Sequence, residues 1–128
     1  KVGANAVTGM ARLLLALESI DTGYSRARHF ERFKTVITPG TMINGGVSTN
    51  VVPDRCEALV DVRLTPEFDQ EGIEALIQQA IHEVTAQTDR RRFSYELLNS
   101  LPAAISDEHA PLFGIVEQAV HLAAEPRR

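Results

Sequence analysis

The sequence predicts an α+β domain in which helices cover one face of an antiparallel sheet. Three segments carry apolar residues at helical spacing, and three shorter segments are rich in β-forming residues. Their order along the chain is α β β α β α. The chain has 128 residues and is 44% hydrophobic, which suits one domain with a single core.

Each predicted helix has its own start signal. Asn5 and Asp69 can cap helices over Ala6–Glu18 and Gln70–Ala86, and Pro111 lies in the first turn of a helix over Ala110–Ala123. Apolar residues recur every three or four positions in the first helix at Val7, Met10, Leu13, Leu14 and Leu17. The second helix has the cleaner stripe, at Ile73, Leu76, Ile77, Ala80, Ile81 and Val84.

The predicted strands cover Phe33–Asn44, Arg55–Leu64 and Phe93–Leu98. Pro39 and Gly40 interrupt the first, and because proline is tolerated mainly at sheet edges, we expect an edge strand there. Three strands are one fewer than in a ferredoxin-like two-layer sandwich, whose βαββαβ order places another strand before the first helix. We therefore expect a ferredoxin-like fold with its first strand missing, in a fragment of a longer protein.

The connection between the first two strands has a defined shape. Gly45 and Gly46 permit unusual backbone angles and a close backbone approach, and Pro53 holds the preceding residue extended. Asn50 stands at the polar end of this loop and can both donate and accept hydrogen bonds.

The strand that follows presents two different faces. Alternation places Cys56, Ala58, Val60 and Val62 on a core face and Arg63 on the opposite, half-exposed face. A guanidinium there can bind a carboxylate ligand through two hydrogen bonds. The alternative is an ordinary turn followed by an Arg63 that pairs only with Asp61.

Composition argues against several classes of partner. A net charge of −4 disfavours nucleic acid, and no apolar run reaches membrane-spanning length. The single cysteine, Cys56, fits a reducing compartment, and we expect a cytoplasmic protein. The four histidines lack the spacing of metal ligands, so we expect neither a metal site nor a catalytic centre within this chain; they are His29, His82, His109 and His121.

Four short motifs, taken in order, resemble one known family. They are Gly3-x-Asn5-Ala6-Val7, Thr38-Pro39-Gly40, Gly45-Gly46-Val47-x-x-Asn50-Val51-Val52-Pro53-Asp54 and Asp61-Val62-Arg63. This succession resembles the lid, or dimerisation, domain of the M20 metallopeptidases, a family that includes acetylornithine deacetylase, succinyl-diaminopimelate desuccinylase, aminoacylase and carboxypeptidase G2-like enzymes. On this resemblance, residues 1–107 form the lid and residues 108–128 form a helix that leads back into a catalytic domain.

The resemblance implies a parent enzyme that hydrolyses an amide bond next to a carboxylate, as in N-acyl amino acids or peptides. Two zinc ions, or cobalt or manganese, would lie in its catalytic domain, and a lid histidine that acts on the oxyanion would precede Lys1. Asn50 would contact substrate together with Gly46 and Thr49, and Arg63 would bind the substrate carboxylate. Thr49 stands where desuccinylases carry a second asparagine, which speaks against desuccinylase specificity.

The same resemblance implies a homodimer. We expect it to form through the edge strand Thr35–Asn44 and the helix Ala6–Glu18, because an edge strand has unpaired backbone groups. The chain's other partners would be its own catalytic domain and a small substrate that bears a carboxylate. The alternative function is a free-standing ferredoxin-like regulatory module that binds amino acids.

Overall fold

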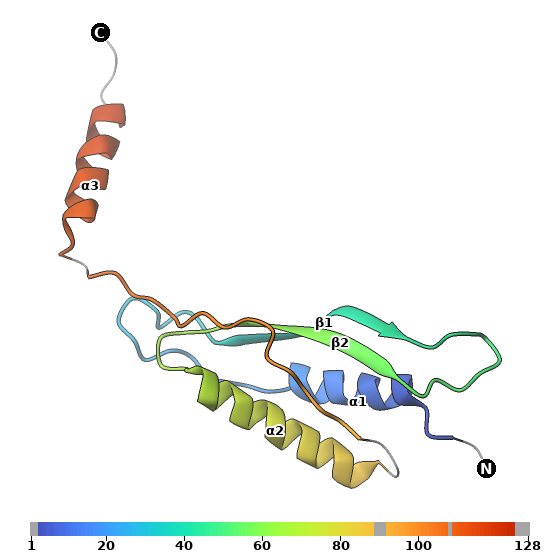
Figure 1. Cartoon of the computed structure of the whole chain (residues 1–128). Coiled ribbons are helices and arrows are strands. Elements are labelled where there is room, and N and C mark those ends of the chain that lie inside the picture. Colours follow the sequence, from blue (N-terminus) through green and yellow to red (C-terminus); the bar gives the residue numbers. More distant parts are fainter. Residues whose placement is uncertain (1–2, 89–91, 108, 125–128) are drawn as a thin grey trace.

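The protein is described by a computed structural model, which covers residues 3–88, 92–107 and 109–124 (Figure 1). The element order is α β β α α, so the fold is α+β. The elements are α1 (Ala6–Glu18), β1 (Val36–Gly45), β2 (Cys56–Arg63), α2 (Gln70–Gln87) and α3 (Pro111–Ala124).

The helices form where their start signals predict them. The Asn5 side chain accepts a hydrogen bond from the Thr8 N–H at 3.1 Å, and Asp69 accepts one from the Gly72 N–H at 2.8 Å. Both are N-cap contacts, which satisfy N–H groups that the first turn of a helix leaves without partners. The bounds of α1 are those predicted, and α2 and α3 differ from the prediction by one residue.

The two strands pair antiparallel from Val36 opposite Arg63 to Gly45 opposite Cys56. The predicted interruption at Pro39-Gly40 is a bulge rather than a break, because the register shifts between Pro39 and Met42 and pairing then resumes. Burial alternates along β2 as the sequence predicts. The half-buried face carries Cys56, Ala58, Val60 and Val62.

The core lies between the helices and the inner face of this hairpin. Leu13 and Leu17 of α1 meet Ala80 and Val84 of α2, and Ile37 and Val60 of the strands pack partly buried against them. α1 packs on both strands, and α2 packs along α1 (Figure 1). The prediction of two helices on one face is therefore met in a modified form, with α1 in direct contact with the sheet.

The prediction of a third strand over Phe93–Leu98 is wrong. In the described part of the chain the sheet contains only β1 and β2, and residues 92–107 run as irregular backbone. Phe93 packs partly buried against the core, and the Tyr95 hydroxyl donates to Glu74 of α2 at 2.7 Å. These contacts hold the segment against α2, where no strand lies alongside to supply backbone partners.

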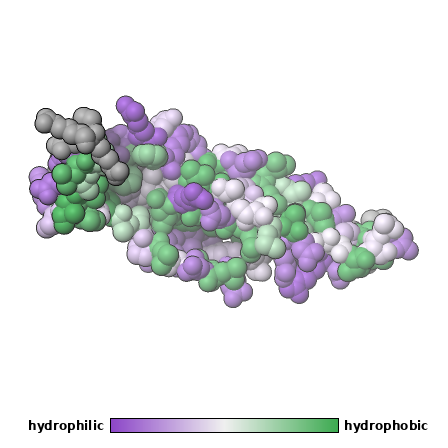
Figure 2. Space-filling view, turned by 90° about the horizontal axis from the view of Figure 1, so that it is seen from above, coloured by the Kyte–Doolittle hydropathy of each residue, from purple (hydrophilic) through white to green (hydrophobic). Residues whose placement is uncertain are grey.

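α3 stands apart from this body. It packs against none of the other described helices or strands, and all its side chains are exposed (Figure 1). Seen from above, a group of hydrophobic residues is visible beside hydrophilic ones at the end of the molecule that carries α3 (Figure 2). No helix among the described residues is long and apolar enough to cross a membrane.

Candidate functional site

The end of the β1–β2 hairpin is tightly built around its two glycines. A Cβ atom on Gly45 would lie 2.8 Å from Cγ2 of Val7 and 2.9 Å from Sγ of Cys56, so this position has no room for a side chain. Gly46 has φ +83°, a left-handed conformation that glycine adopts without strain. The turn therefore needs both glycines, each for a different reason.

The loop beyond Gly46 is fixed to the helix layer. The Ala6 N–H at the start of α1 donates to the Pro53 carbonyl at 2.8 Å. Within the loop, the Ser48 hydroxyl donates to Oδ1 of Asn50 at 2.7 Å, and the Val51 N–H donates to the Ser48 carbonyl at 3.4 Å. Because Ser48 occupies the amide oxygen, Asn50 presents its NH₂ group as the donor on an exposed loop.

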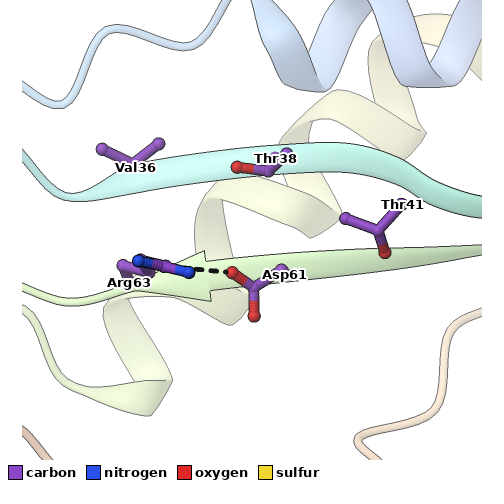
Figure 3. A pocket seen from close by; sticks show the side chains of 5 residues that line it. All are labelled: Val36, Thr38, Thr41, Asp61 and Arg63. Atoms are coloured by element: carbon purple, nitrogen blue, oxygen red, sulfur yellow. Dashed lines mark hydrogen bonds and ion pairs between the residues drawn. The ribbon is translucent and has the colours of Figure 1, made fainter.

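Arg63 lies at the other end of the hairpin, on the face of the sheet that points away from the helices. It borders a shallow depression of about 660 Å³ (Figure 3). The strand register supplies the remaining lining, because Val36 is opposite Arg63 and Thr38 is opposite Asp61. The lining residues are Val36, Thr38, Thr41, Asp61 and Arg63.

Arg63 and Asp61 form the ion pair that the sequence offers as an alternative. Nε of Arg63 lies 3.4 Å from Oδ2 of Asp61, as the dashed line in Figure 3 marks. The two side chains are 85% and 54% exposed, and pairs as open as this contribute little to stability. The contact uses Nε, so the guanidinium still turns its terminal N–H groups to solvent, where a carboxylate can reach them.

The structure does not bring the predicted site residues into one pocket. Gly46, Thr49 and Asn50 follow Gly45, which pairs with Cys56, whereas Arg63 pairs with Val36 at the far end of the ladder. Cys56 and Arg63 are the two ends of β2, seven residue steps apart in extended strand, which corresponds to about 23 Å. Sequence reasoning also missed Thr38 and Thr41 as lining residues, because only the register of β1 against β2 places them there.

The described residues offer no metal centre. Across residues 3–88, 92–107 and 109–124, no three His, Cys, Asp or Glu side chains gather closely enough to hold an ion. Cys56 is half-buried beside Gly45, and burial raises the pKa of its thiol, which disfavours the thiolate form that binds metals. The described side chains therefore supply no set of zinc ligands.

Comparison with known proteins gives a consistent result. Residues 1–89 match the M20 family model described as the peptidase dimerisation domain. Succinyl-diaminopimelate desuccinylase from Dinoroseobacter shibae is 30% identical over 110 residues, which cover 80% of this chain and 28% of that protein. Acetylornithine deacetylase from Vibrio campbellii is 27% identical over 128 residues, which cover 97% of this chain and 33% of that protein.

The chain thus spans about a third or less of the length of these relatives. No solved structure gives a significant match. The family match covers well over half of the chain. This chain therefore belongs to the M20 peptidase family and carries its dimerisation domain.

Proposed function

We propose that this chain is the dimerisation and substrate-binding lid of a zinc-dependent M20 amidohydrolase that cleaves an amide bond next to a carboxylate. One observation carries the proposal. The exposed guanidinium of Arg63 borders an open depression on the sheet face that the helices leave uncovered. The relatives named above are a deacetylase and a desuccinylase, which supports an N-acyl amino acid as substrate.

In this proposal Arg63 anchors the substrate. Its fork matches a carboxylate in charge and geometry, and Thr38 and Thr41 offer hydroxyl groups beside it. Asp61 keeps the guanidinium oriented through Nε. Arg63 acts equally on bound substrate and transition state, so it affects KM more than kcat.

Asn50 has a separate task. The loop lies about 23 Å from the Arg63 end of the ladder. Asn50 and Arg63 of one protomer therefore cannot touch the same small substrate. We propose that the two residues of one chain serve different active sites of the dimer. The NH₂ group of Asn50, left open by the bond from Ser48, would donate to the acyl group of the substrate, with Gly46 and Thr49 shaping the approach.

The dimer would form through β1 and α1. β1 has only one neighbour in the described sheet, so one of its edges carries unpaired backbone groups. α1 lies against this strand, and its Leu15 is exposed. Within residues 3–88, 92–107 and 109–124 nothing pairs with the outer edge of β2 either, and we propose that a further strand of the complete ferredoxin-like sandwich pairs there.

The zinc ions would be held outside this chain, in the catalytic domain to which α3 leads. They would supply the activated water for hydrolysis. The residues described here would bind the substrate, orient it and join two subunits. The cytoplasm is the compartment that the single, unpaired cysteine favours.

Steady-state kinetics on the full-length protein tests the proposal. N-acetyl-L-ornithine and N-succinyl-L,L-diaminopimelate are the probes, assayed with added zinc. We expect Arg63→Ala to lower kcat/KM by a factor that corresponds to about 2–5 kcal/mol of lost binding free energy, mainly through a higher KM. Arg63→Lys should not restore it, because lysine keeps the charge and loses the fork. Asn50→Ala should lower kcat as well.

The matched control is Arg55→Ala, which removes an exposed arginine that pairs with Glu57 at the other end of the same hairpin. It should leave kcat/KM within a few-fold of the unmodified protein. A folded Arg63→Ala enzyme with unchanged kcat/KM would rule out Arg63 as the substrate anchor. If the protein hydrolyses neither probe, the proposed substrate class is rejected.

A further inference from the structure

The free edge of β1 is divided by its bulge, and we infer that only its second part, Met42–Gly45, pairs with a second copy of this chain, with Asn44 on the two-fold axis. The inference rests on the proposed dimer and specifies its register. Register matters because it fixes where each loop of one protomer lies on the other.

The bulge ends the pairing segment on one side. Register shifts between Pro39 and Met42, so the residues between them do not continue the ladder. Pro39 also lacks an N–H, and prolines in sheets point their nitrogen away from the neighbouring strand. At Pro39 the free edge therefore has no donor to offer a second copy, and the strand bends there.

The hairpin turn ends the pairing segment on the other side. Gly46 has φ +83°, so the chain leaves the extended direction immediately after Gly45. Between these two stops lie four residues, Met42 to Gly45, which pair regularly with Leu59 to Cys56. A ladder between two copies is restricted to this length.

Hydrogen-bond alternation selects the residues that face outward. The nitrogen of Pro39 points to the free edge of β1, so Pro39 and Val60 form a non-hydrogen-bonded pair. Because the two kinds of pair alternate along β2, the next pair, Leu59 and Met42, is a hydrogen-bonded pair. Ile43 and Gly45 consequently direct both N–H and C=O to the free edge. Placing Ile43 of each copy opposite Gly45 of the other forms four backbone hydrogen bonds and sets Asn44 against Asn44.

The side chains suit a second copy of this chain. Asn44 can donate and accept at once, so it complements itself across a two-fold axis. Met42 and Ile43 are 66% and 53% exposed, and Gly45 lets the opposite strand approach closely. No residue from Met42 to Gly45 is charged, so self-pairing brings no like charges together. The match to a dimerisation domain favours this occupant over an unrelated peptide strand.

Disulfide trapping in the full-length protein tests the register. Each variant carries Cys56→Ser and one new cysteine, and it is oxidised with copper–phenanthroline. Asn44→Cys should cross-link in most of the dimer, because residues facing each other in a non-hydrogen-bonded pair have Cα atoms about 4.5 Å apart. Thr38→Cys is the matched control on the same face and strand. In this register its two copies lie roughly 40 Å apart and should not cross-link.

Ile43→Cys separates the neighbouring register. With Asn44 on the axis, two Ile43 residues are diagonal neighbours about 7–8 Å apart and form little disulfide. Efficient cross-linking of Ile43→Cys or Thr38→Cys, with none from Asn44→Cys, would overturn the inference. A protein that stays monomeric at every concentration in sedimentation equilibrium would instead overturn the proposed dimer itself.

A charge at the axis gives a second measurement. Asn44→Asp keeps the shape of the side chain and sets two carboxylates against each other, so the dissociation constant of the dimer should rise at least about tenfold, and less at high salt. Thr38→Asp adds the same charge outside the pairing segment and should leave the constant nearly unchanged. Equal effects of the two variants would contradict the placement of the axis at Asn44.

Discussion

At the scale of single residues, the hairpin end depends on the absence of a side chain at Gly45. Val7 of α1 and Cys56 of β2 both stand within 3 Å of the place that a Cβ would occupy. This contact joins the start of α1, the end of β1 and the start of β2. The Gly-Gly pair thus serves packing at Gly45 and turn geometry at Gly46.

Gly45→Ala should therefore destabilise the protein. Overpacking of this kind typically costs about 1–3 kcal/mol, since Val7 or the β2 backbone must move. Urea unfolding monitored by circular dichroism measures the loss. Gly3→Ala is the control, because a Cβ there meets nothing within 4 Å and should change stability by less than about 0.5 kcal/mol. Equal stability of the two variants would contradict the crowding at Gly45.

Glu67 shows how a loop carboxylate can hold two connections together. The Ser25 hydroxyl donates a hydrogen bond to the Glu67 carboxylate. Three further donors bond to it, which are the backbone N–H groups of Arg26 and of Glu67 itself and the hydroxyl of Thr65. These bonds lower the pKa of Glu67 from its ordinary value of 4.5 to about 2. Nearby, the buried hydroxyls of Thr35 and Thr65 lie 2.8 Å apart and tie the same two segments.

This pKa predicts acid sensitivity. A carboxylate with a lower pKa in the folded state stabilises the fold above its unfolded pKa of 4.5, and the contribution disappears as the pH falls towards 2. Glu67→Gln should accordingly destabilise at pH 7, with the difference from the unmodified protein shrinking between pH 4.5 and 2. Urea midpoints across this range give the measurement. Ser25→Ala should weaken the same pH dependence, and a constant Glu67→Gln difference would exclude the linkage.

At the scale of elements, the sequence was most informative where a segment carries its own signals. α1 and α2 follow from caps and apolar stripes, because a helix satisfies its backbone within itself. β2 follows from its alternation and from a neighbour that the chain supplies nearby. Phe93–Leu98 has comparable alternation and forms no strand, because alternation specifies faces and not a partner.

The same distinction holds for the candidate site. Arg63 and Asn50 could be singled out from residue type and motif, and the exposed face of β2 from its alternation. The depression itself could not, since Thr38 and Thr41 reach it only through a register that a bulge alters. The separation of Arg63 from the loop follows instead from the length of β2, which runs from Cys56 to Arg63.

We expect Tyr95 to hold the irregular segment, residues 92–107, against α2. Its hydroxyl donates to Glu74 at 2.7 Å and accepts from Gln78 at 2.9 Å. Tyr95→Phe removes both bonds and keeps the ring, so we expect faster amide hydrogen exchange over residues 93–101 and nearly unchanged exchange in α1. Tyr24→Phe is the control, since the Tyr24 ring interacts with Lys34 through its face. Unchanged exchange in Tyr95→Phe would show that Phe93 alone anchors the segment.

At the scale of the whole molecule, the described residues form a compact part and a helix, α3, that contacts no other described helix or strand. Among the residues that the structure describes, the buried apolar ones lie in α1 and α2, namely Leu13, Leu17, Ile73, Ala80 and Val84. On α3 the hydrophobic residues spread over one broad side, with Gly114, Glu117, Gln118 and His121 on the other. The alignment with acetylornithine deacetylase extends across nearly the whole chain, whereas the dimerisation-domain match ends at residue 89.

A helix with such a face is stable only against a partner, and we propose that this partner is the catalytic domain of the full-length protein. Ile115→Asp should then place a charge in a buried contact and destabilise that protein by about 2–4 kcal/mol. Gln118→Asp, on the polar side of α3, should change stability by less than about 0.5 kcal/mol. Thermal and urea unfolding of the two variants provides the measurement, with sedimentation equilibrium to confirm that both remain dimeric. If both variants unfold like the unmodified protein, α3 is exposed in the full-length protein as well, and the proposed docking is wrong. If Ile115→Asp also dissociates the dimer, α3 belongs to the subunit interface instead.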